Sequence, residues 1–391
     1  MRLRFWFGYW WPSWLIGWPV RATLRAPHPR GVRCLGVLLP EHIGDVVLTS
    51  PLLRALRGHF PEAEIIAAIS PEAAPLLTPC PFVQRVLVWP KGRRAAWRMG
   101  WALRRLAPDM VVVPRADPDQ RWAPLVAVLS GAPRRISLTD ALTTVGRLKR
   151  LQAEPFFSET VQVSLGVLHE SARRLEIARR LGVNTPDRRL ETWVNQSDEA
   201  RAEAFVTSLP TGPRIAIGLG ASAAVRTWPV ERFGKLLDRL SAGGAVVPVI
   251  IVGPHEMALV EALRAACRVP VYCLAGATLG ASIAILRRCT LFIGNDSGPM
   301  HLACSVALPV VEISAHPVGA SDRHPNSPEK CGPVGAATKV VRPLLPASDS
   351  CSGGCQQLAA HCILGVGVED VVAAIEALGV LPRDSNREAC R

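Results

Sequence analysis

Hydrophobic and polar positions alternate along most of the chain in two patterns. Short apolar runs such as CLGVLLP (34–40) are typical of buried strands, and segments such as SPLLRALRGHFP (50–61) have the apolar spacing of a helix. Because buried strands alternate with helices, the pattern predicts an α/β fold with parallel sheets covered by helices on both faces. Further strands are expected at 63–70, 83–90 and 109–117, and helices at 91–108 and 169–182.

The second half of the chain repeats this pattern. A polar stretch with three prolines, from about Asn184 to Pro213, separates the halves and predicts a domain boundary. We therefore expect two Rossmann-like domains, residues 31–190 and 191–391, facing a central cleft. In the second domain, strands are expected at 214–220, 246–253, 290–296 and 309–314, and helices at 229–240, 257–267, 282–289 and 368–379.

Residues 1–30 form an extension of a different kind. The run from Phe5 to Val20 holds five of the eleven tryptophans and is flanked by arginines. It is shorter than the ~20 apolar residues that span a bilayer, and it lacks a signal-peptide cleavage site. Tryptophan with flanking arginine suits the head-group boundary, which predicts an interfacial membrane anchor. The alternative is an extension without a function.

The net charge indicates which kinds of partner the chain binds, and the cysteine content indicates the cellular compartment in which it is expected. The net charge of +13 favours anionic partners such as nucleotides, phosphorylated glycans and acidic lipids. Nucleic acid is not expected, because no zinc-finger or RNA-binding signature is present. The cysteine count is odd, and several cysteines lie in apolar runs, which favours reduced core thiols and a cytoplasmic location. These core candidates are Cys267, Cys273, Cys289 and Cys304.

The basic helix predicted at 91–108 adds a second surface of interest. Its arginines and two tryptophans would form one amphipathic face, which is either a solvated surface or a contact for a membrane or an anionic acceptor. The residues are Arg93, Arg94, Trp97, Arg98, Trp101, Arg104 and Arg105.

Ligands of open α/β sheets bind at the carboxyl ends of strands, so the loops after strands are the first candidates for chemistry. In PEHIGDVVLTSP (40–51), Gly44 permits a tight turn and places Asp45 near a helix start. Asp45 is then either a helix cap, the commoner role for this residue type, or a base for a sugar hydroxyl.

The second candidate loop is FIGNDSGPMHLACSVALP (292–309). Pro299 suits a first helical position, so a helix is expected to begin beside Ser297 and Gly298. Its free N–H groups and positive dipole end would bind a diphosphate, with His301 in the first turn reaching the same group. The alternative is an ordinary capped helix.

Both loops resemble signature stretches of glycosyltransferase family 9, which contains the ADP-heptose:lipopolysaccharide heptosyltransferases. The resembling segments are GDVVLTSPLLRALRGHFPEAEI (44–65) and GNDSGPMHLACSVALPVV (294–311). Weaker resemblances to the family occur, in the same order along the chain, at 166–182, 220–240, 324–335 and 361–378. The likeness to the family therefore covers roughly Cys34 to Leu381.

The resemblance implies a GT-B fold and an inverting, metal-independent sugar transfer. The donor would be a nucleotide sugar, by default ADP-heptose. The acceptor would be an anionic, lipid-linked glycan such as the lipopolysaccharide core, at the inner face of the cytoplasmic membrane. The nucleotide sugar is a substrate, and no cofactor is expected. The family's catalytic base falls on Asp45, and its donor contacts fall on Arg226, Asp296, Ser297, Gly298 and His301.

The sequence departs from the family pattern at two positions, and it contains one group of cysteines that needs a separate interpretation. Arg226 stands where the family commonly has lysine, and Glu312 begins a segment that is usually apolar. Glu312 would line the donor pocket or pair with a basic neighbour. Packing is expected for the group near the C-terminus, because adjacent His and Cys residues do not easily share one metal tetrahedron. That group is Cys351, Cys355, His361 and Cys362.

Two other functional classes stay open. One is a nucleotide-sugar epimerase or hydrolase of the same fold. The other is a non-catalytic, membrane-associated protein that binds sugar nucleotides.

Overall fold

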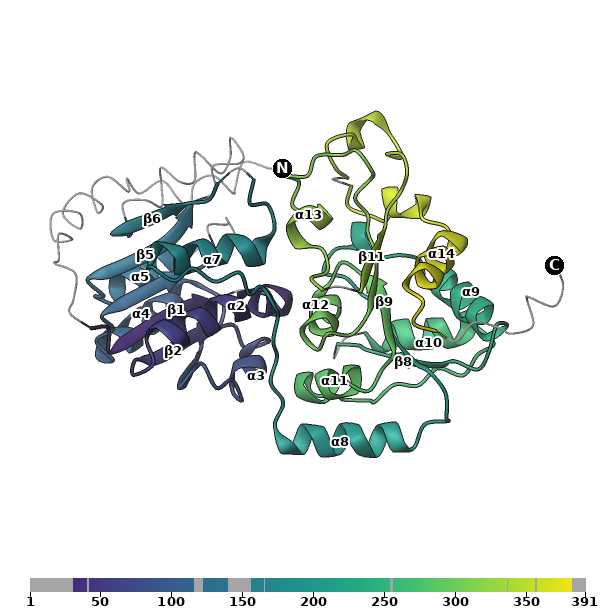
Figure 1. The fold of residues 1–391 in the computed structure, drawn as a ribbon, viewed down its shortest axis with the longest axis horizontal. Helices are drawn as coiled ribbons and strands as arrows, with labels where there is room; N and C mark the ends of the chain where they lie inside the picture. The colour runs from purple at the N-terminus through teal and green to yellow at the C-terminus, as the bar shows by residue number, and fades with distance from the viewer. Residues whose placement is uncertain are drawn as a thin grey trace. The chain divides into compact units, whose positions relative to one another are not determined.

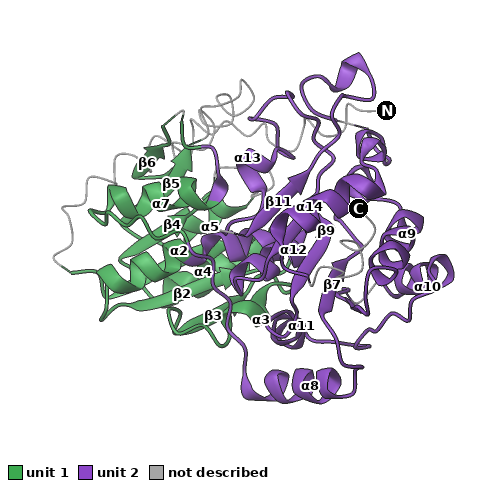
Figure 2. Ribbon diagram, turned by 45° about the vertical axis from the view of Figure 1, so that its right-hand side comes forward, with its two compact units in different colours: residues 1–42, 51–167, 171–188 green, residues 43–50, 168–170, 189–391 purple. Residues whose placement is uncertain are grey.

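The computed structural model describes residues 31–40, 42–115, 122–139, 156–164, 166–253, 256–335, 337–355 and 357–381. The predicted membrane anchor in residues 1–30 lies outside the described residues. By their contacts, residues 1–42, 51–167 and 171–188 form unit 1, and residues 43–50, 168–170 and 189–391 form unit 2 (Figure 2). The segments 43–50 and 168–170, which were expected in the first domain, thus group with the second unit.

Unit 1 contains a parallel sheet of six strands in the order β3-β2-β1-β4-β5-β6 (Figure 1). The order reverses direction between β1 and β4, which is the topological switch point of this doubly wound sheet. The strands are β1 (Cys34–Leu39), β2 (Glu64–Ile69), β3 (Arg85–Val88), β4 (Met110–Val113), β5 (Arg134–Thr139) and β6 (Glu159–Gln162). The accompanying helices are α2 (Ile43–His59), α3 (Ala74–Leu77), α4 (Arg93–Arg105), α5 (Ala123–Leu129) and α7 (Glu170–Arg180).

Unit 2 contains a parallel sheet of five strands in the order β11-β10-β9-β7-β8, with its switch point between β7 and β9. The strands are β7 (Arg214–Gly218), β8 (Val247–Ile250), β9 (Leu291–Asn295), β10 (Val310–Ile313) and β11 (Thr338–Val341). The α-helices are α8 (Gln196–Thr207), α9 (Val230–Ser241), α10 (Met257–Ala266), α11 (Leu279–Leu286), α12 (Gly298–Ser305), α13 (Pro328–Cys331) and α14 (Val368–Leu378). Three short 3₁₀ turns are η2 (Ala224–Arg226), η3 (Asp349–Cys351) and η4 (Cys362–Gly365).

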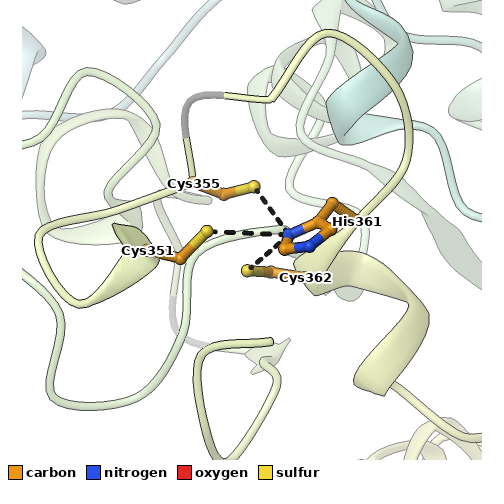
Figure 3. A group of neighbouring side chains, drawn as sticks. All are labelled: Cys351, Cys355, His361 and Cys362. Atoms are coloured by element: carbon orange, nitrogen blue, oxygen red, sulfur yellow. Dashed lines mark hydrogen bonds between the residues drawn. The ribbon is translucent and has the colours of Figure 1, made fainter. Parts of the chain in front are cut away.

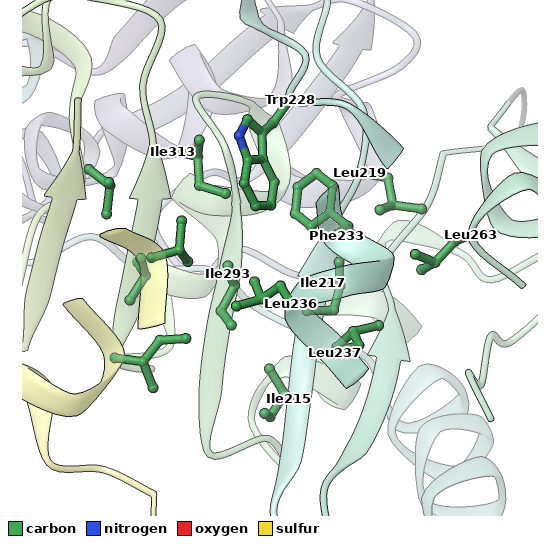
Figure 4. Close-up of a cluster of buried hydrophobic side chains, with 14 of the residues drawn as sticks. Ile215, Ile217, Leu219, Trp228, Phe233, Leu236, Leu237, Leu263, Ile293 and Ile313 are labelled. Carbon is green, nitrogen blue, oxygen red and sulfur yellow. The ribbon is translucent and has the colours of Figure 1, made fainter. Parts of the chain in front are cut away.

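The core of unit 2 forms between its sheet and the helices that cover it. Trp228 and Phe233 are fully buried, and their rings meet edge to face with centroids 4.8 Å apart (Figure 4). Isoleucines of four strands, among them Ile217 and Ile293, belong to the same cluster. The residues before and after β7 and β9 therefore emerge from a rigid, close-packed layer.

Helix α2 begins earlier than the sequence predicts. Its first residue is Ile43 rather than Ser50, so Pro51 lies inside the helix. Proline cannot donate to the carbonyl four residues before it, which here belongs to Val47. The Ser50 hydroxyl donates to that carbonyl instead, at 2.7 Å, and so satisfies the acceptor that proline leaves open. This earlier start places Asp45 in the first helical turn.

The predicted linker also contains a helix, α8. Asn195 caps it by accepting a hydrogen bond from the Asp198 backbone N–H at 2.8 Å. Its Glu199 side chain pairs with Arg287 and Arg288, at 2.7 and 2.8 Å. Only Ala202 and Val206 of this helix are buried, which explains why its apolar pattern is weak in the sequence.

The basic amphipathic helix is confirmed as α4. Its buried face is formed by Ala96, Met99, Gly100 and Leu103, whereas Trp97 and Trp101 are about half exposed. The Arg104 guanidinium lies 5.7 Å from the centre of the Trp101 ring, a cation–π contact. None of the helices in the described part of the chain has the length and apolar character that crossing a membrane requires.

Candidate active site

The candidate loops follow strands at the switch points of the two sheets. The loop after β1 leads into α2, which carries Asp45, and the loop after β9 begins with Asp296. Arg226 lies in η2, in the loop after β7. Loops at these positions form the usual ligand sites of doubly wound sheets.

Asp45 is not the N-cap of α2. His42 occupies that position, with an extended backbone and no capping side-chain hydrogen bond. The half-buried Asp45 side chain belongs to the first turn, where the helix dipole stabilises negative charge. Its backbone carbonyl accepts a hydrogen bond from the Thr49 hydroxyl at 2.8 Å.

Helix α12 begins where the sequence predicts. Ser297 is its N-cap, and Pro299 lies in its first turn. The Ser297 hydroxyl makes no capping hydrogen bond but donates to the backbone carbonyl of Asn295 at 3.2 Å. The N-terminus of the helix is therefore not closed by the serine side chain, which is the condition for an anion to approach it.

The two predicted loops meet inside unit 2. A Cβ atom added to Gly44 would lie 2.6 Å from Cδ2 of His301, and one added to Gly298 would lie 3.5 Å from a methyl carbon of Ile43. His301 is 5% exposed, so its ring is part of this packing. The first turn of α2 and the first turn of α12 are thus in direct contact, although some 250 residues separate them in the sequence.

Arg226 and Asp296, both predicted to contact the donor, are paired with each other. Arg226 Nη1 lies 2.8 Å from a carboxylate oxygen of Asp296, and Nη2 donates to the Ser222 hydroxyl. The Asp296 side chain is 8% exposed and that of Arg226 is 20% exposed. A carboxylate repels a diphosphate, and in this structure Asp296 instead orients the guanidinium of Arg226.

Glu312 is fully buried on β10, where it lies opposite Gly294 of β9. Burial, together with the negative charge of Asp296, raises the pKa of Glu312 well above its usual value, despite the opposing effects of Ser314, Arg342 and Arg226. Its Oε2 has no hydrogen-bond partner among the described residues. Glu312 therefore holds its proton more tightly in the folded protein than an exposed glutamate does.

Asn295 is a positioning residue that the sequence analysis did not single out. Its fully buried side chain donates to the Leu219 carbonyl at 2.7 Å and accepts from the Trp228 backbone N–H at 3.0 Å. These two bonds hold both ends of the segment that carries Arg226. The signal in the sequence was a polar residue at the end of an otherwise apolar strand.

In the cysteine group near the C-terminus, for which packing was expected, the candidate ligand atoms of all four side chains lie within 4.8 Å of one another. The adjacent His361 and Cys362 bring Nδ1 and Sγ to 3.6 Å from each other, and two further thiols converge on the same nitrogen (Figure 3). By contrast, Cys267, Cys273, Cys289 and Cys304 are free thiols in largely apolar surroundings, as expected. Burial raises the pKa of Cys289 and Cys304 to about 12.

The sequence profile of glycosyltransferase family 9 (heptosyltransferase) matches residues 103–340. Lipopolysaccharide heptosyltransferase 3 of Escherichia coli is 24% identical over 287 residues, 69% of this chain and 80% of that protein. Lipooligosaccharide heptosyltransferase 2 of Haemophilus influenzae is 23% identical over 330 residues, 78% of this chain and 87% of that protein. The profile includes the loop after β9 but not the segment 44–65.

Two solved structures share the fold. A glycosyltransferase family 9 protein from Veillonella parvula superposes with a TM-score of 0.72 at 23% identity, covering 88% of this chain and 97% of that one. The E. coli ADP-heptose LPS heptosyltransferase II superposes with a TM-score of 0.65 at 21% identity, covering 88% and 98%. The predicted GT-B-type fold with two Rossmann-like domains is confirmed.

Replacing Glu312 with Gln is expected to change how stability depends on pH. Because the folded-state pKa of Glu312 is raised, the folded chain binds more protons than the unfolded chain above about pH 4.5. The stabilising contribution of the protonated side chain is complete below that pH and is lost as pH rises towards the folded-state pKa. The free energy of unfolding of Glu312→Gln, relative to wild type, should increase as pH rises above about 4.5 in urea titrations. The exposed Glu369→Gln serves as the control, and a pH-independent difference for Glu312→Gln would contradict a raised pKa of Glu312.

Replacing Gly44 with Ala tests the contact between α2 and α12. The new methyl group would overlap the His301 ring, so the free energy of unfolding should fall by ~1–3 kcal/mol. Gly58 lies in the same helix with nothing within 4 Å of an added Cβ, so Gly58→Ala should be neutral or stabilising by up to ~1 kcal/mol. Chemical denaturation measures both, and equal effects of the two substitutions would argue against close packing at Gly44.

Proposed function

The chain belongs to glycosyltransferase family 9 (heptosyltransferase) and is a glycosyltransferase, and from this membership we propose an inverting transfer of a sugar. The donor is a nucleotide sugar, by default ADP-heptose. The acceptor is a hydroxyl of an anionic, lipid-linked surface glycan, by default the lipopolysaccharide core. Asp45 is the base, and Arg226 with the N-terminus of α12 binds the diphosphate.

One observation carries this proposal. The contacts of Gly44 with His301 and of Gly298 with Ile43 bring the turn that bears Asp45 beside the N-terminus of α12. A base and an anion site at adjacent helix starts are the two groups that displacement of a diphosphate requires. Arg226 adds a cation that Asp296 and Ser222 hold in a fixed orientation.

The proposed reaction is a single displacement. Asp45 accepts the proton of the acceptor hydroxyl, whose oxygen forms a bond to the anomeric carbon of the donor. The bond from that carbon to the diphosphate oxygen breaks, and the nucleoside diphosphate leaves with the electron pair. Attack opposite the leaving group inverts the anomeric configuration. Arg226 and the N–H groups of α12 stabilise the charge that develops on the diphosphate, a contribution of ~3 kcal/mol for a well-placed donor.

The default donor and acceptor rest on the relatives. The similar E. coli structure is described as an ADP-heptose LPS heptosyltransferase, and the sequence relatives are named for lipopolysaccharide or lipooligosaccharide. An acceptor carried by a lipid requires the enzyme to work at a membrane surface, which for a nucleotide-sugar donor means the cytoplasmic face. The exposed tryptophans and arginines of α4 suit a peripheral contact with that surface.

Asp45→Asn is expected to separate catalysis from binding. Asparagine keeps the shape of the side chain but cannot take a proton, so turnover should fall by ~10²–10⁴-fold. The dissociation constant for ADP should change by less than ~3-fold, because the base contacts the acceptor. Turnover is followed as ADP release with a lipopolysaccharide-core acceptor, and ADP binding by titration calorimetry.

The exposed Glu62→Gln, which also removes one carboxylate, should leave both quantities unchanged. Unchanged turnover in Asp45→Asn would remove Asp45 as the base. Sugar release or epimerisation that needs no acceptor would favour the epimerase or hydrolase alternative. ADP binding without any turnover in the wild type would favour the non-catalytic alternative.

Arg226→Met is expected to weaken ADP binding by ~10–100-fold, because a charge-assisted hydrogen bond contributes ~1.5–3 kcal/mol. Adenosine, which lacks the diphosphate, should bind the variant and the wild type equally. The exposed Arg264→Met is the matched control, since Arg264 pairs with Glu261 away from this site. Thermal shifts with ADP, UDP and GDP identify the nucleotide. Equal weakening of adenosine binding would show that Arg226 does not act on the diphosphate.

A further inference from the structure

The segment between β11 and α14, residues 342–367, has little regular structure. Its described residues contain only the short turns η3 and η4, and two of its leucines, Leu344 and Leu358, are 80% and 90% exposed. Ile363 and Val366 of this segment join the main core, whereas its three buried cysteines form a small separate cluster with Val225. An apolar cluster of this size is too small to order a long loop.

The three cysteines of this cluster point at one atom. Cys351, Cys355 and Cys362 place their Sγ atoms 3.6, 3.7 and 3.6 Å from Nδ1 of His361 (Figure 3). All four candidate ligand atoms lie within 4.8 Å of one another. The cysteines are 1%, 3% and 1% exposed, so the group is closed to solvent on the cysteine side.

Hydrogen bonding does not account for this convergence. Nδ1 of an imidazole either accepts one hydrogen bond or donates one, so it cannot bond three thiols at once. Disulfide formation does not account for it either, because the three are free thiols and an odd number cannot pair completely. Simple packing requires burial of the sulfur atoms but gives no reason for them to surround a polar nitrogen.

A tetrahedral metal ion accounts for it. With Zn–S bonds of ~2.3 Å and a Zn–N bond of ~2.0–2.1 Å at tetrahedral angles, each sulfur lies ~3.6 Å from the nitrogen. The three observed distances agree with this value. We propose that Cys351, Cys355, His361 and Cys362 bind one Zn²⁺ ion in a closed site of three thiolates and one imidazole. Such a site is structural, because it leaves no position for a substrate.

The surroundings of the sulfur atoms suit thiolate ligands. The Ala347 backbone N–H points at Cys362 Sγ from 3.5 Å, and the Ser348 hydroxyl points at Cys351 Sγ from the same distance. Donors placed around metal-bound thiolates spread their negative charge and fix their orientation. Both donors lie in the same loop, so that binding of the ion would order the loop as a whole.

The proposed ion lies beside the loop that carries Arg226. Val225, next to Arg226 in the sequence, packs against the cysteines. Directly after η4, the carbonyl of Val366 accepts hydrogen bonds from Trp228 Nε1 at 3.0 Å and from Arg232 Nη1 at 2.6 Å. The loop that holds the proposed ion, residues 342–367, therefore packs against the segment 223–232 and forms hydrogen bonds with it. On the proposed function, zinc would hold the diphosphate-binding arginine in position without taking part in the reaction.

Elemental analysis of the full-length protein, purified without chelators or an affinity metal, tests the site. We expect one equivalent of zinc per chain, and its loss in Cys355→Ser. The matched variant Cys267→Ser, at a partly buried thiol outside the group, should keep the full equivalent. Removing the zinc from wild type with a chelator should lower Tm by at least ~5 °C, and adding Zn²⁺ back should restore it.

A second measurement uses wild type alone, in case Cys355→Ser does not fold. Chelation should expose three further thiols to a thiol reagent, and Co²⁺ added to the metal-free chain should give the absorption of a tetrahedral thiolate complex. Absence of metal together with no thiol protection by Zn²⁺ would overturn the site, and one equivalent of iron would overturn the choice of ion. The metal content does not depend on which sugar is transferred, so it tests the zinc site separately from the proposed function. Weaker ADP binding by the metal-free chain tests only whether the loop holds Arg226 in position.

Discussion

The side chain of Asn295 holds together the part of the molecule on which the candidate site depends. It lies at the end of β9, is fully buried, and bonds the backbone on both sides of the loop after β7. A buried amide left without partners costs ~1–3 kcal/mol, so the two neighbouring loops are fixed in one arrangement. Trp228 extends this connection, since its backbone bonds Asn295 and its indole bonds Val366. Thus β9, the Arg226 loop and the segment before α14 form one hydrogen-bonded unit.

The charged groups buried around Arg226 place a second constraint on the candidate site. Arg226 lies close to two acidic groups, one of which, Asp296, is its direct partner. The other, Glu312, lies on the next strand, and burial together with the charge of Asp296 raises its pKa. Arg226 is thus balanced by Asp296, and the raised pKa of Glu312 favours its uncharged form. A diphosphate that reaches Arg226 meets a guanidinium that is already oriented, so that little conformational entropy is lost on binding.

Local signals in the sequence predicted much of the fold and some of the site. The Gly-Asn-Asp-Ser-Gly-Pro run at 294–299 ends a strand and starts a helix through the chemistry of its own residues, and the structure follows it. Predictions failed where a distant or unusual partner decides the outcome. The apolar spacing of residues 50–61 suggested a helix over that range, but the helix begins at Ile43 and continues through Pro51, where the Ser50 hydroxyl bonds the Val47 carbonyl. The pairing of Arg226 with Asp296 and the convergence of three thiols on His361 depend on tertiary geometry, which residue spacing does not specify.

The position of the Ser297 hydroxyl has a consequence for evolution. An aspartate at this position would be among the best caps for α12 and would stabilise the free protein, because its carboxylate would bond the first-turn N–H groups. The same carboxylate would occupy the place proposed for the diphosphate and repel it. Serine donates its hydroxyl to Asn295 instead, at 3.2 Å, and makes no capping bond. On the proposed function, substitutions at residue 297 that stabilise the free protein would weaken donor binding, so they should be selected against when substrate is present.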